Sequence, residues 1–287
     1  MQKQKKVSSV HFDFENLSDF PVDSGTVSSM FETILNEQLP DLNMQNTKVK
    51  REVQIVDGGG SGAEGNLIRV APDTGSGESC FLENLDLLFR HELTHLLLAE
   101  ACGTGNIQII FWEGIPNWFA ENKVRTIKFG FSYHEYCRAF LVSDKLLPLN
   151  LFVIAHDYYS MRRDFRYDLQ AASFCGYLAG KYGIDSIIGA LKEFQPPTPD
   201  HPVIEISKLL MGFSGKKLSA LEKDWQKFLL NKVTARPDRE ERAASYTLPS
   251  FEEPPYTHCG FCNDRYDRSH THCPYCGVDT GIVLSVR

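Results

Sequence analysis

The sequence predicts an α+β fold in which a mixed sheet comes first and a long series of helices follows. Alternation of apolar and polar residues, the period of a half-buried strand, is found in segments before residue 75, whereas helical periodicity dominates after it. The 287 residues are 42% hydrophobic and 23% charged, which is typical of globular proteins and provides ample core. This size suggests one large domain or two small ones.

The first elements are strands placed around one helix. Residues 7–15 show loose strand alternation, and residues 47–57 alternate clearly and are rich in β-branched residues. Between them, residues 27–42 place their apolar side chains on one side of a helix. The glycine-rich residues 58–65 lack the Gly-Lys-Ser/Thr ending of a phosphate-binding loop, so we interpret them as a flexible connecting loop. A further strand is expected at residues 66–73.

The central helix is expected over residues 84–102, and it carries the run His91-Glu92-Leu93-Thr94-His95. Two His residues four positions apart lie one turn apart on the same face, close enough to hold one metal ion. Zinc accepts imidazole nitrogens at about 2.0–2.1 Å, and a catalytic zinc site has three protein ligands and a water molecule. Glu92 lies off the ligand face and can take a proton from that water. The alternative is a hydrogen-bonded pair of core histidines, because this helix is apolar nearly all round.

A third metal ligand is needed, and Glu113 is the best candidate. The 17 residues between His95 and Glu113 allow for the end of the helix, a reversal and a strand-like apolar run over residues 106–112. We expect Glu113 at the mouth of a second helix, with Pro116 in the first turn of that helix. Glu121, two turns further along, is the rival ligand.

These residues resemble the motif of the gluzincins, the thermolysin-like and aminopeptidase N-like metallopeptidases of the zincin class. In that family a Glu ligand follows His-Glu-x-x-His after about eighteen residues or more, in a phrase like Trp-x-x-Glu-Gly-x-Ala. The segment Phe111-Trp112-Glu113-Gly114-Ile115 is similar to a shortened version of it. The resemblance implies that His91, His95 and Glu113 bind a catalytic zinc ion and that Glu92 is the general base in peptide-bond hydrolysis.

The same resemblance implies two further features. In aminopeptidase-like members a Tyr that opens a later helix donates a hydrogen bond to the tetrahedral intermediate, and Tyr167 stands in a similar segment. An ordinary surface or core role for Tyr167 is an equal alternative, and His156, Tyr158 and Tyr159 compete for the catalytic role. In zincin-type proteins a strand placed like residues 66–73 forms the edge of the sheet, where backbone hydrogen bonds hold an extended peptide.

The chain also departs from the family pattern, and two other functions remain open. Pro116 replaces the usual Ala, and Asn117 replaces the Asp that orients a ligand in thermolysin-like enzymes. These changes are compatible with a zincin fold that has no catalytic activity and serves only to bind a partner. A SprT-like protease acting on protein–DNA crosslinks is the other alternative, but such proteases use a third His shortly downstream. Here the nearest His after His95 is His134, 39 positions on.

The rest of the main domain has the pattern of helices. A helix is expected at each of five segments, namely residues 133–146, 167–182, 184–194, 203–211 and 218–233. After residue 234 the composition changes, because proline and a charge run replace the apolar periodicity. We therefore expect a zincin-like metallopeptidase domain at residues 1–234, a linker at 235–257 and a zinc ribbon at 258–287.

Four of the eight Cys residues form two Cys-x-x-Cys pairs with ten residues between them: Cys259 and Cys262, then Cys273 and Cys276. Four thiolates at this spacing are typical of a closed structural zinc site, and a module of about 30 residues needs such a staple to fold. The alternative of a redox or disulfide pair does not suit a reducing compartment. The chain is thus expected to hold two zinc ions, one catalytic and one structural.

Charge and hydropathy limit the expected partners. The net charge is −7, and the ribbon has no Lys while three Asp balance its three Arg. Both features disfavour a phosphate-binding surface, so we expect a peptide or protein substrate, and a protein partner on the ribbon, rather than nucleic acid. The sequence has no apolar run of about 20 residues, and no apolar segment follows its charged N-terminus. We therefore expect no membrane span, no signal peptide and a cytoplasmic location.

Overall fold

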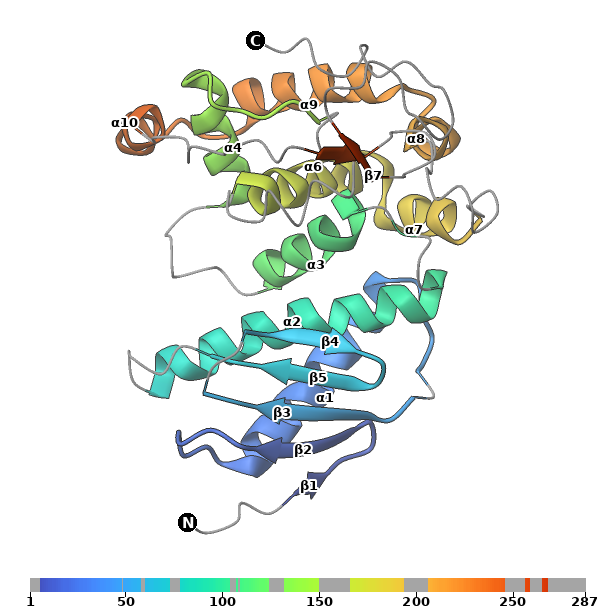
Figure 1. The fold of residues 1–287 in the computed structure, drawn as a ribbon, viewed down its shortest axis with the longest axis vertical. Helices are drawn as coiled ribbons and strands as arrows, with labels where there is room; N and C mark the ends of the chain where they lie inside the picture. The colour runs from blue at the N-terminus through green and yellow to red at the C-terminus, as the bar shows by residue number, and fades with distance from the viewer. Residues whose placement is uncertain are drawn as a thin grey trace.

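The computed structural model of the protein describes residues 6–47, 49–57, 60–72, 78–103, 107, 109–123, 132–149, 166–193, 206–245, 256–258 and 265–267. These residues form a small mixed sheet and many helices, which confirms the predicted α+β class. Figure 1 shows the sheet and two helices in one half of the molecule and the remaining helices stacked in the other half.

The main sheet has five strands in the order β1-β2-β3-β5-β4. The strands are β1 (Val7–Ser8), β2 (Phe12–Asn16), β3 (Arg51–Ile55), β4 (Gly62–Glu64) and β5 (Leu67–Val70). The three central strands β2, β3 and β5 are parallel, whereas β1 and β4 pair antiparallel at the two ends. The sheet is therefore mixed, as the sequence predicts.

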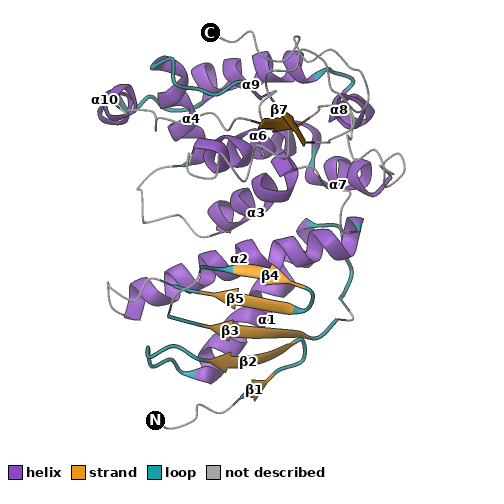
Figure 2. Cartoon of the chain, in the orientation of Figure 1, coloured by secondary structure: helices purple, strands orange, loops and turns teal. Residues whose placement is uncertain are grey.

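Two helices cover one face of this sheet, α1 (Ser24–Asp41) and α2 (Glu78–Cys102) (Figure 2). The Asp23 carboxylate begins α1 by accepting a hydrogen bond from the Thr26 N–H at 2.7 Å. The rings of Phe12 on β2, Phe31 on α1 and Phe89 on α2 then meet in the core, with Phe31 and Phe89 stacked at 3.9 Å. This aromatic contact fixes both helices to the same buried face of the sheet.

The sheet edge differs from the expectation for residues 66–73. Part of the glycine-rich segment, expected to be a loop, is strand β4, which pairs with β5 after a tight turn at Gly65. Gly65 has a φ of +58°, which glycine adopts without strain. As a consequence β5 is paired on both sides, and among the described residues the edge beside α2 is β4.

The second half of the molecule is helical. Its described helices are α3 (Ile109–Lys123), α4 (Tyr133–Val142), α6 (Arg166–Tyr182), α7 (Ile184–Glu193), α8 (Ile206–Ser214), α9 (Leu218–Lys232) and α10 (Pro237–Ser245). Helix α6 is buried along most of its length, and Figure 1 shows it between α3 and α9. Helix α3 lies between α2 and α6, so it joins the two halves of the molecule.

The start of the expected linker is a helix. Residues 237–245 form α10, which packs against α4. The Ser143 hydroxyl donates a hydrogen bond to the Glu240 carbonyl at 3.2 Å, and Arg138 lies 3.4 Å from the Glu240 carboxylate. A Pro at the first helical position and the helix-forming Glu, Arg and Ala that follow explain why this charged run folds.

The expected zinc ribbon is described only in a small part. Strands β6 (Tyr256–His258) and β7 (Arg265–Asp267) pair antiparallel. The four Cys residues of the predicted structural zinc site lie outside the described residues. Among the helices that are described, none combines the length and the apolar character needed to cross a membrane.

Candidate metal centre

Helix α2 is held in place by buried polar contacts around the His-Glu-x-x-His run. Arg90 pairs with Asp86 on its own helix and with Glu37 of α1, whose carboxylate is 2.6 Å away. Gln38 of α1 donates its amide hydrogens to the Arg90 carbonyl at 3.0 Å and to the Thr94 hydroxyl at 2.9 Å. These contacts lie on the side of α2 that faces α1, so they fix the rotation of the helix about its axis.

A second contact anchors the other end of α2 to the sheet. The buried Arg51 guanidinium at the start of β3 lies 2.6 Å from the Glu100 carboxylate, which also accepts a hydrogen bond from Thr47 at 2.8 Å. Burial lowers the pKa of Arg51 below its usual value, and the Glu100 charge opposes that effect. Helix α2 is thus fixed around the motif histidines by α1, through Arg90 and Thr94, and after them by the sheet, through Glu100.

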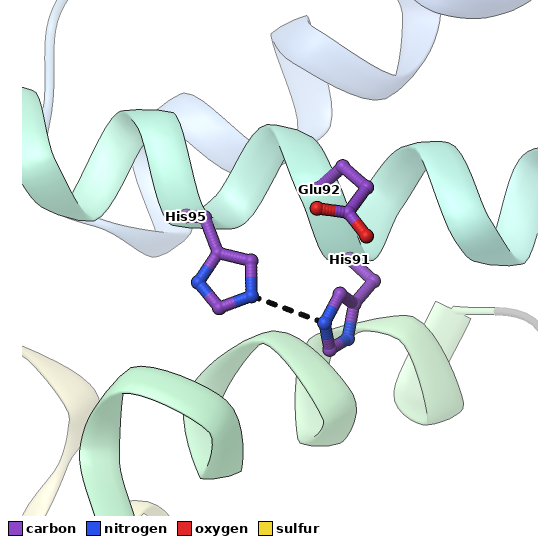
Figure 3. A group of neighbouring side chains, drawn as sticks. All are labelled: His91, Glu92 and His95. Atoms are coloured by element: carbon purple, nitrogen blue, oxygen red, sulfur yellow. Dashed lines mark hydrogen bonds between the residues drawn. The ribbon is translucent and has the colours of Figure 1, made fainter. Parts of the chain in front are cut away.

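The two motif imidazoles meet edge to face. The Nε2 atoms of His91 and His95 are 3.1 Å apart, and the rings are inclined at 77° (Figure 3). The His95 residue is only 6% exposed and His91 is partly buried. Both nitrogens therefore point to one small region beside α2, as a shared metal ion requires.

Glu113 completes this region from helix α3. Its Oε2 atom is 3.7 Å from the Nε2 atom of His91 and 3.7 Å from that of His95, and the residue is 8% exposed. The point in their plane equidistant from these three atoms is about 2.0 Å from each, which matches the length of zinc–ligand bonds. The two nitrogens and one carboxylate oxygen thus fit a zinc ion.

The local structure around Glu113 differs from the expectation in one respect. The apolar run over residues 106–112 was expected to be strand-like, but α3 begins at Ile109. Glu113 therefore lies one turn inside α3 rather than at its mouth, and Pro116 stands within the helix. An apolar run of this length fits a buried helix or a buried strand equally well by pattern, and here its residues 109–112 belong to a helix that packs between α2 and α6.

Glu92 supplies a second buried carboxylate next to the imidazoles. The residue is 6% exposed, and its carboxylate lies with the ligand nitrogens of His91 and His95 in a group whose atoms are all within 4.8 Å of one another. Figure 3 shows this carboxylate beside His91. Glu92 is within reach of an ion too, but Glu113 has an oxygen equally close to both nitrogens. Of the two carboxylates, Glu113 therefore has the geometry that suits a third ligand better, and Glu92 lies next to it.

Trp112 contacts the site, a role the sequence analysis did not give it. Its ring centroid is 4.6 Å from that of His95, with 40° between the planes. The indole therefore packs against the His95 ring in a tilted arrangement and limits its rotation. The position of Trp112 directly before Glu113 already placed it near the site. The packing of α3 is needed to show that its ring contacts His95.

Asn117 makes a contact different from the one a ligand-orienting residue makes. Its side-chain amide donates to the Glu113 backbone carbonyl at 2.9 Å, one turn earlier in α3. This bond ties Asn117 to the backbone that carries the carboxylate, not to an imidazole. The side chain of the rival ligand Glu121 lies outside the described residues.

Two other predicted or competing residues lie in the helical half. Tyr167 is 3% exposed in the first turn of α6, the helix that packs against α3. His134 of α4 shares a 2.8 Å hydrogen bond with the Ser173 hydroxyl, and its ring packs against Phe228. Burial lowers the pKa of His134 to about 4. The side chain that joins the imidazoles of His91 and His95 is therefore the Glu113 carboxylate, whereas His134 contacts Ser173 and Phe228. His156, Tyr158 and Tyr159 lie outside the described residues.

Comparison of the chain with protein-family models finds no match, and comparison with curated protein sequences finds none either. The chemistry assigned to the site therefore rests on the placement of its own side chains.

Proposed function

We propose that the protein is a zinc-dependent metallopeptidase with a zincin-like catalytic domain. The observation that carries the proposal is the approach of one Glu113 oxygen to 3.7 Å from both motif nitrogens. Two imidazoles and a carboxylate leave one position of a tetrahedral zinc site open for water, which is the composition of catalytic rather than structural sites. The alternative, a hydrogen-bonded pair of core histidines, does not account for the two buried carboxylates of Glu92 and Glu113 beside them.

Each residue of the site has a separate task in this proposal. His91, His95 and Glu113 would hold the metal, and zinc bound there would supply Lewis acidity that lowers the pKa of water. Glu92 would accept a proton from the water as its oxygen bonds to the scissile carbonyl carbon, and would deliver that proton to the amine nitrogen as the C–N bond breaks. The Glu92 residue is 6% exposed, and its carboxylate lies within 4.8 Å of the ligand nitrogens of both histidines. Tyr167 is proposed to donate a hydrogen bond where negative charge develops on the scissile carbonyl.

The proposed substrate is an extended peptide that lies along strand β4. Figure 1 shows β4 as the strand beside α2, and among the described residues it pairs only with β5. Its other edge can therefore accept a further strand by backbone hydrogen bonds. The small residues Gly62 and Ala63 leave room for the side chains of such a peptide.

The direct test replaces Glu92 by Gln, which keeps the size of the side chain and removes its basicity. We expect this variant to bind as much zinc as the wild type and to lose hydrolysis of a mixed peptide library, measured by mass spectrometry of the digest. The control is Glu193→Gln, which removes an exposed carboxylate at the end of α7, away from the site and from β4. Equal turnover by the wild type and the Glu92→Gln protein would remove Glu92 from the mechanism.

A count of bound metal separates this proposal from a fold that only binds a partner. We propose a second, structural zinc at Cys259, Cys262, Cys273 and Cys276, so native mass spectrometry should show two zinc ions per chain. His95→Ala should lose one of them. If this variant retains the full zinc content of the wild type, His95 is not a ligand and the peptidase proposal fails.

A further inference from the structure

A groove of about 740 Å³ opens in the helical half, apart from the metal centre. It is lined by residues of α3, α4, α6 and α9, and none of the proposed metal-site residues is among them. Trp118 of α3 lines it five positions after Glu113, which places the two side chains about 140° apart around the helix. This volume is within the usual range of ligand pockets, roughly 300–1,000 Å³.

Aromatic rings form much of the groove surface. Tyr177 of α6 and Phe228 of α9 have ring centroids 5.4 Å apart, and Trp118 lies against the backbone of α6 at Gly176. A Cβ atom at Gly176 would be 2.7 Å from the Trp118 ring, so the absence of a side chain there is what lets the indole lie close to the helix. One turn later, a Cβ at Gly180 would meet nothing within 4 Å, so the groove continues past it.

The charged groups around the groove are mostly positive. Lys181, Lys227 and Lys232 line it together with a single carboxylate, Asp224. Asp224 is already engaged, because Lys181 and Lys216 lie 3.2 Å and 2.6 Å from it. Within the described part of the chain, no ion pair involves Lys227 or Lys232, and both are exposed. The groove therefore carries positive charge that its own residues do not neutralise, in a chain whose net charge is −7.

We propose that this groove binds a small ligand that joins a flat ring to an anionic group. The ring packs between Trp118 and Phe228, and the anionic group faces Lys227 and Lys232. Ring contact supplies the apolar and stacking part of the affinity. The lysines, which lie at the rim in water, select for the charge. Neither half of this chemistry depends on the metal centre, so the proposal stands apart from the proposed peptidase activity.

The first experiment uses two fluorescent probes that differ only in charge. 1-Anilinonaphthalene-8-sulfonate carries the ring system and an anion, whereas N-phenyl-1-naphthylamine is the same ring system without the sulfonate. We expect the full-length wild type to bind the sulfonate at least ten-fold more tightly. Lys227→Glu should weaken sulfonate binding at least ten-fold and leave binding of the neutral probe within two-fold. Lys217→Glu makes the same charge change about 15 Å earlier along α9 and should change neither.

The second experiment fills the groove without disturbing the core. Gly180→Leu places a side chain where the structure has open space, and leucine is a better helix former than glycine. This variant should fold with an unchanged circular dichroism spectrum and lose binding of both probes. Gly189→Leu is the matched control on α7, since a Cβ there also meets nothing within 4 Å, and it should bind both probes normally.

Three results would each overturn the proposal. The first is no binding of the sulfonate probe by the wild type, or binding no tighter than that of the neutral probe. The second is equal weakening by Lys227→Glu and Lys217→Glu, which would mean that net charge rather than the groove attracts the anion. The third is unchanged binding by a folded Gly180→Leu protein, which would place the probe elsewhere.

Discussion

At the scale of single residues, the candidate metal centre combines side chains that the sequence keeps apart. His91 and His95 are one turn apart on α2, whereas Glu113 arrives from α3 with one oxygen 3.7 Å from each imidazole nitrogen. The histidine pair follows from local helix geometry alone. The position of Glu113 does not, because it depends on how α3 packs against α2. A carboxylate buried beside two imidazoles is stable only with such partners or with a cation.

Trp112 should report the metal by its fluorescence. Its ring lies 4.6 Å from that of His95, so a paramagnetic ion such as Co²⁺ bound at the site would quench its emission by close contact. We expect titration of the metal-free protein with Co²⁺ to quench part of the tryptophan emission, and Trp112→Phe to remove that quenchable part. Trp225→Phe, which removes an indole from the core of the helical half, should leave the quenching in place.

His134 should make the stability of the protein depend on pH in mildly acidic solution. Its folded-state pKa is lowered to about 4 from 6.5, because burial disfavours the charged ring. The unfolded chain then binds a proton near pH 6.5 while the folded chain does not until about pH 4. Stability is therefore lost as the pH falls through this window, by at most about 1.4 kcal/mol per pH unit for one proton.

The variant His134→Asn isolates this effect. The Ser173 hydroxyl accepts a hydrogen bond from the Trp225 indole at 3.1 Å, so its own hydrogen is available for Nδ1 of a neutral His134. An Asn side-chain oxygen can accept that hydrogen and does not titrate. Urea unfolding between pH 4 and 7 should give a smaller pH slope for His134→Asn. Parallel curves for the two proteins would show that His134 is not the titrating group.

At this scale the sequence predicted which side chains come together better than it predicted their individual contacts. The spacing predicted that His91, Glu92 and His95 form one cluster. The phrase around Trp112 predicted Glu113 as the third member. The contact of Trp112 with His95 and the bond of Asn117 to its own helix backbone were not predicted. Both depend on side-chain directions that are set only when α3 packs between its neighbours.

At the scale of elements, α3 is positioned by the close approach of one glycine to α6. A Cβ at Gly114 would be 2.6 Å from the Ala171 carbonyl oxygen and 2.6 Å from the Cys175 sulfur. No side chain fits there, so Gly114 sets the distance between α3 and α6. Because Glu113 is the preceding residue, the same contact sets how far its carboxylate reaches toward α2.

Gly114→Ala should therefore weaken both the fold and the metal site. We expect a loss of about 1–3 kcal/mol in the free energy of unfolding, as for other overpacked cores, and weaker Co²⁺ binding as α3 shifts. The control is Gly180→Ala on α6, which meets open space and should raise stability by about 0.5–1 kcal/mol. Urea denaturation and Co²⁺ titration check the two effects. Wild-type behaviour of Gly114→Ala in both would mean that the helices adjust without cost.

Most elements of the main domain were predicted, and two that were missed, β4 and α10, share a cause. The single strand expected at residues 7–15 instead divides into β1 and β2, which pair antiparallel. Strong periodicity indicated α1, α2, α6, α7 and α9, and alternation indicated β2, β3 and β5. Strand β4 lies in a glycine-rich segment and α10 in a charged, Pro-containing one, so neither shows the apolar pattern of a buried element. Strand β4 is stabilised by pairing with β5 across a tight turn, and α10 by packing on α4, far away in the sequence. An apolar periodicity reveals neither partner.

At the scale of the whole molecule, the candidate centre lies where its two halves meet. Helix α2 belongs to the sheet half through Arg51 and the contacts to α1, whereas α3 belongs to the helical half through Gly114. A metal bound by both helices would join these halves by coordinate bonds. Its free energy of binding is then also free energy of folding.

Metal removal should therefore lower the melting temperature of the whole chain. At a free zinc concentration about 1,000 times the Kd, binding adds about 4 kcal/mol, or roughly 7 °C for a chain of 287 residues. The proposed structural zinc contributes too, so the comparison is between the zinc-dependent shifts of the wild type and of His95→Ala. Differential scanning calorimetry should show a smaller shift for the variant. The same shift in both would place all stabilising zinc elsewhere.

The short edge strand has a consequence for what such an enzyme would select. A strand of three residues at the sheet edge, Gly62–Glu64, offers main-chain groups and, apart from the Glu64 side chain, little side-chain surface. Main-chain groups are common to every polypeptide, so recognition at this edge would depend little on the substrate's amino-acid sequence. It would depend instead on whether the substrate segment is already extended. Such an enzyme would accept unfolded or locally unfolded segments as substrates. It would not accept compact folded domains, whatever their composition.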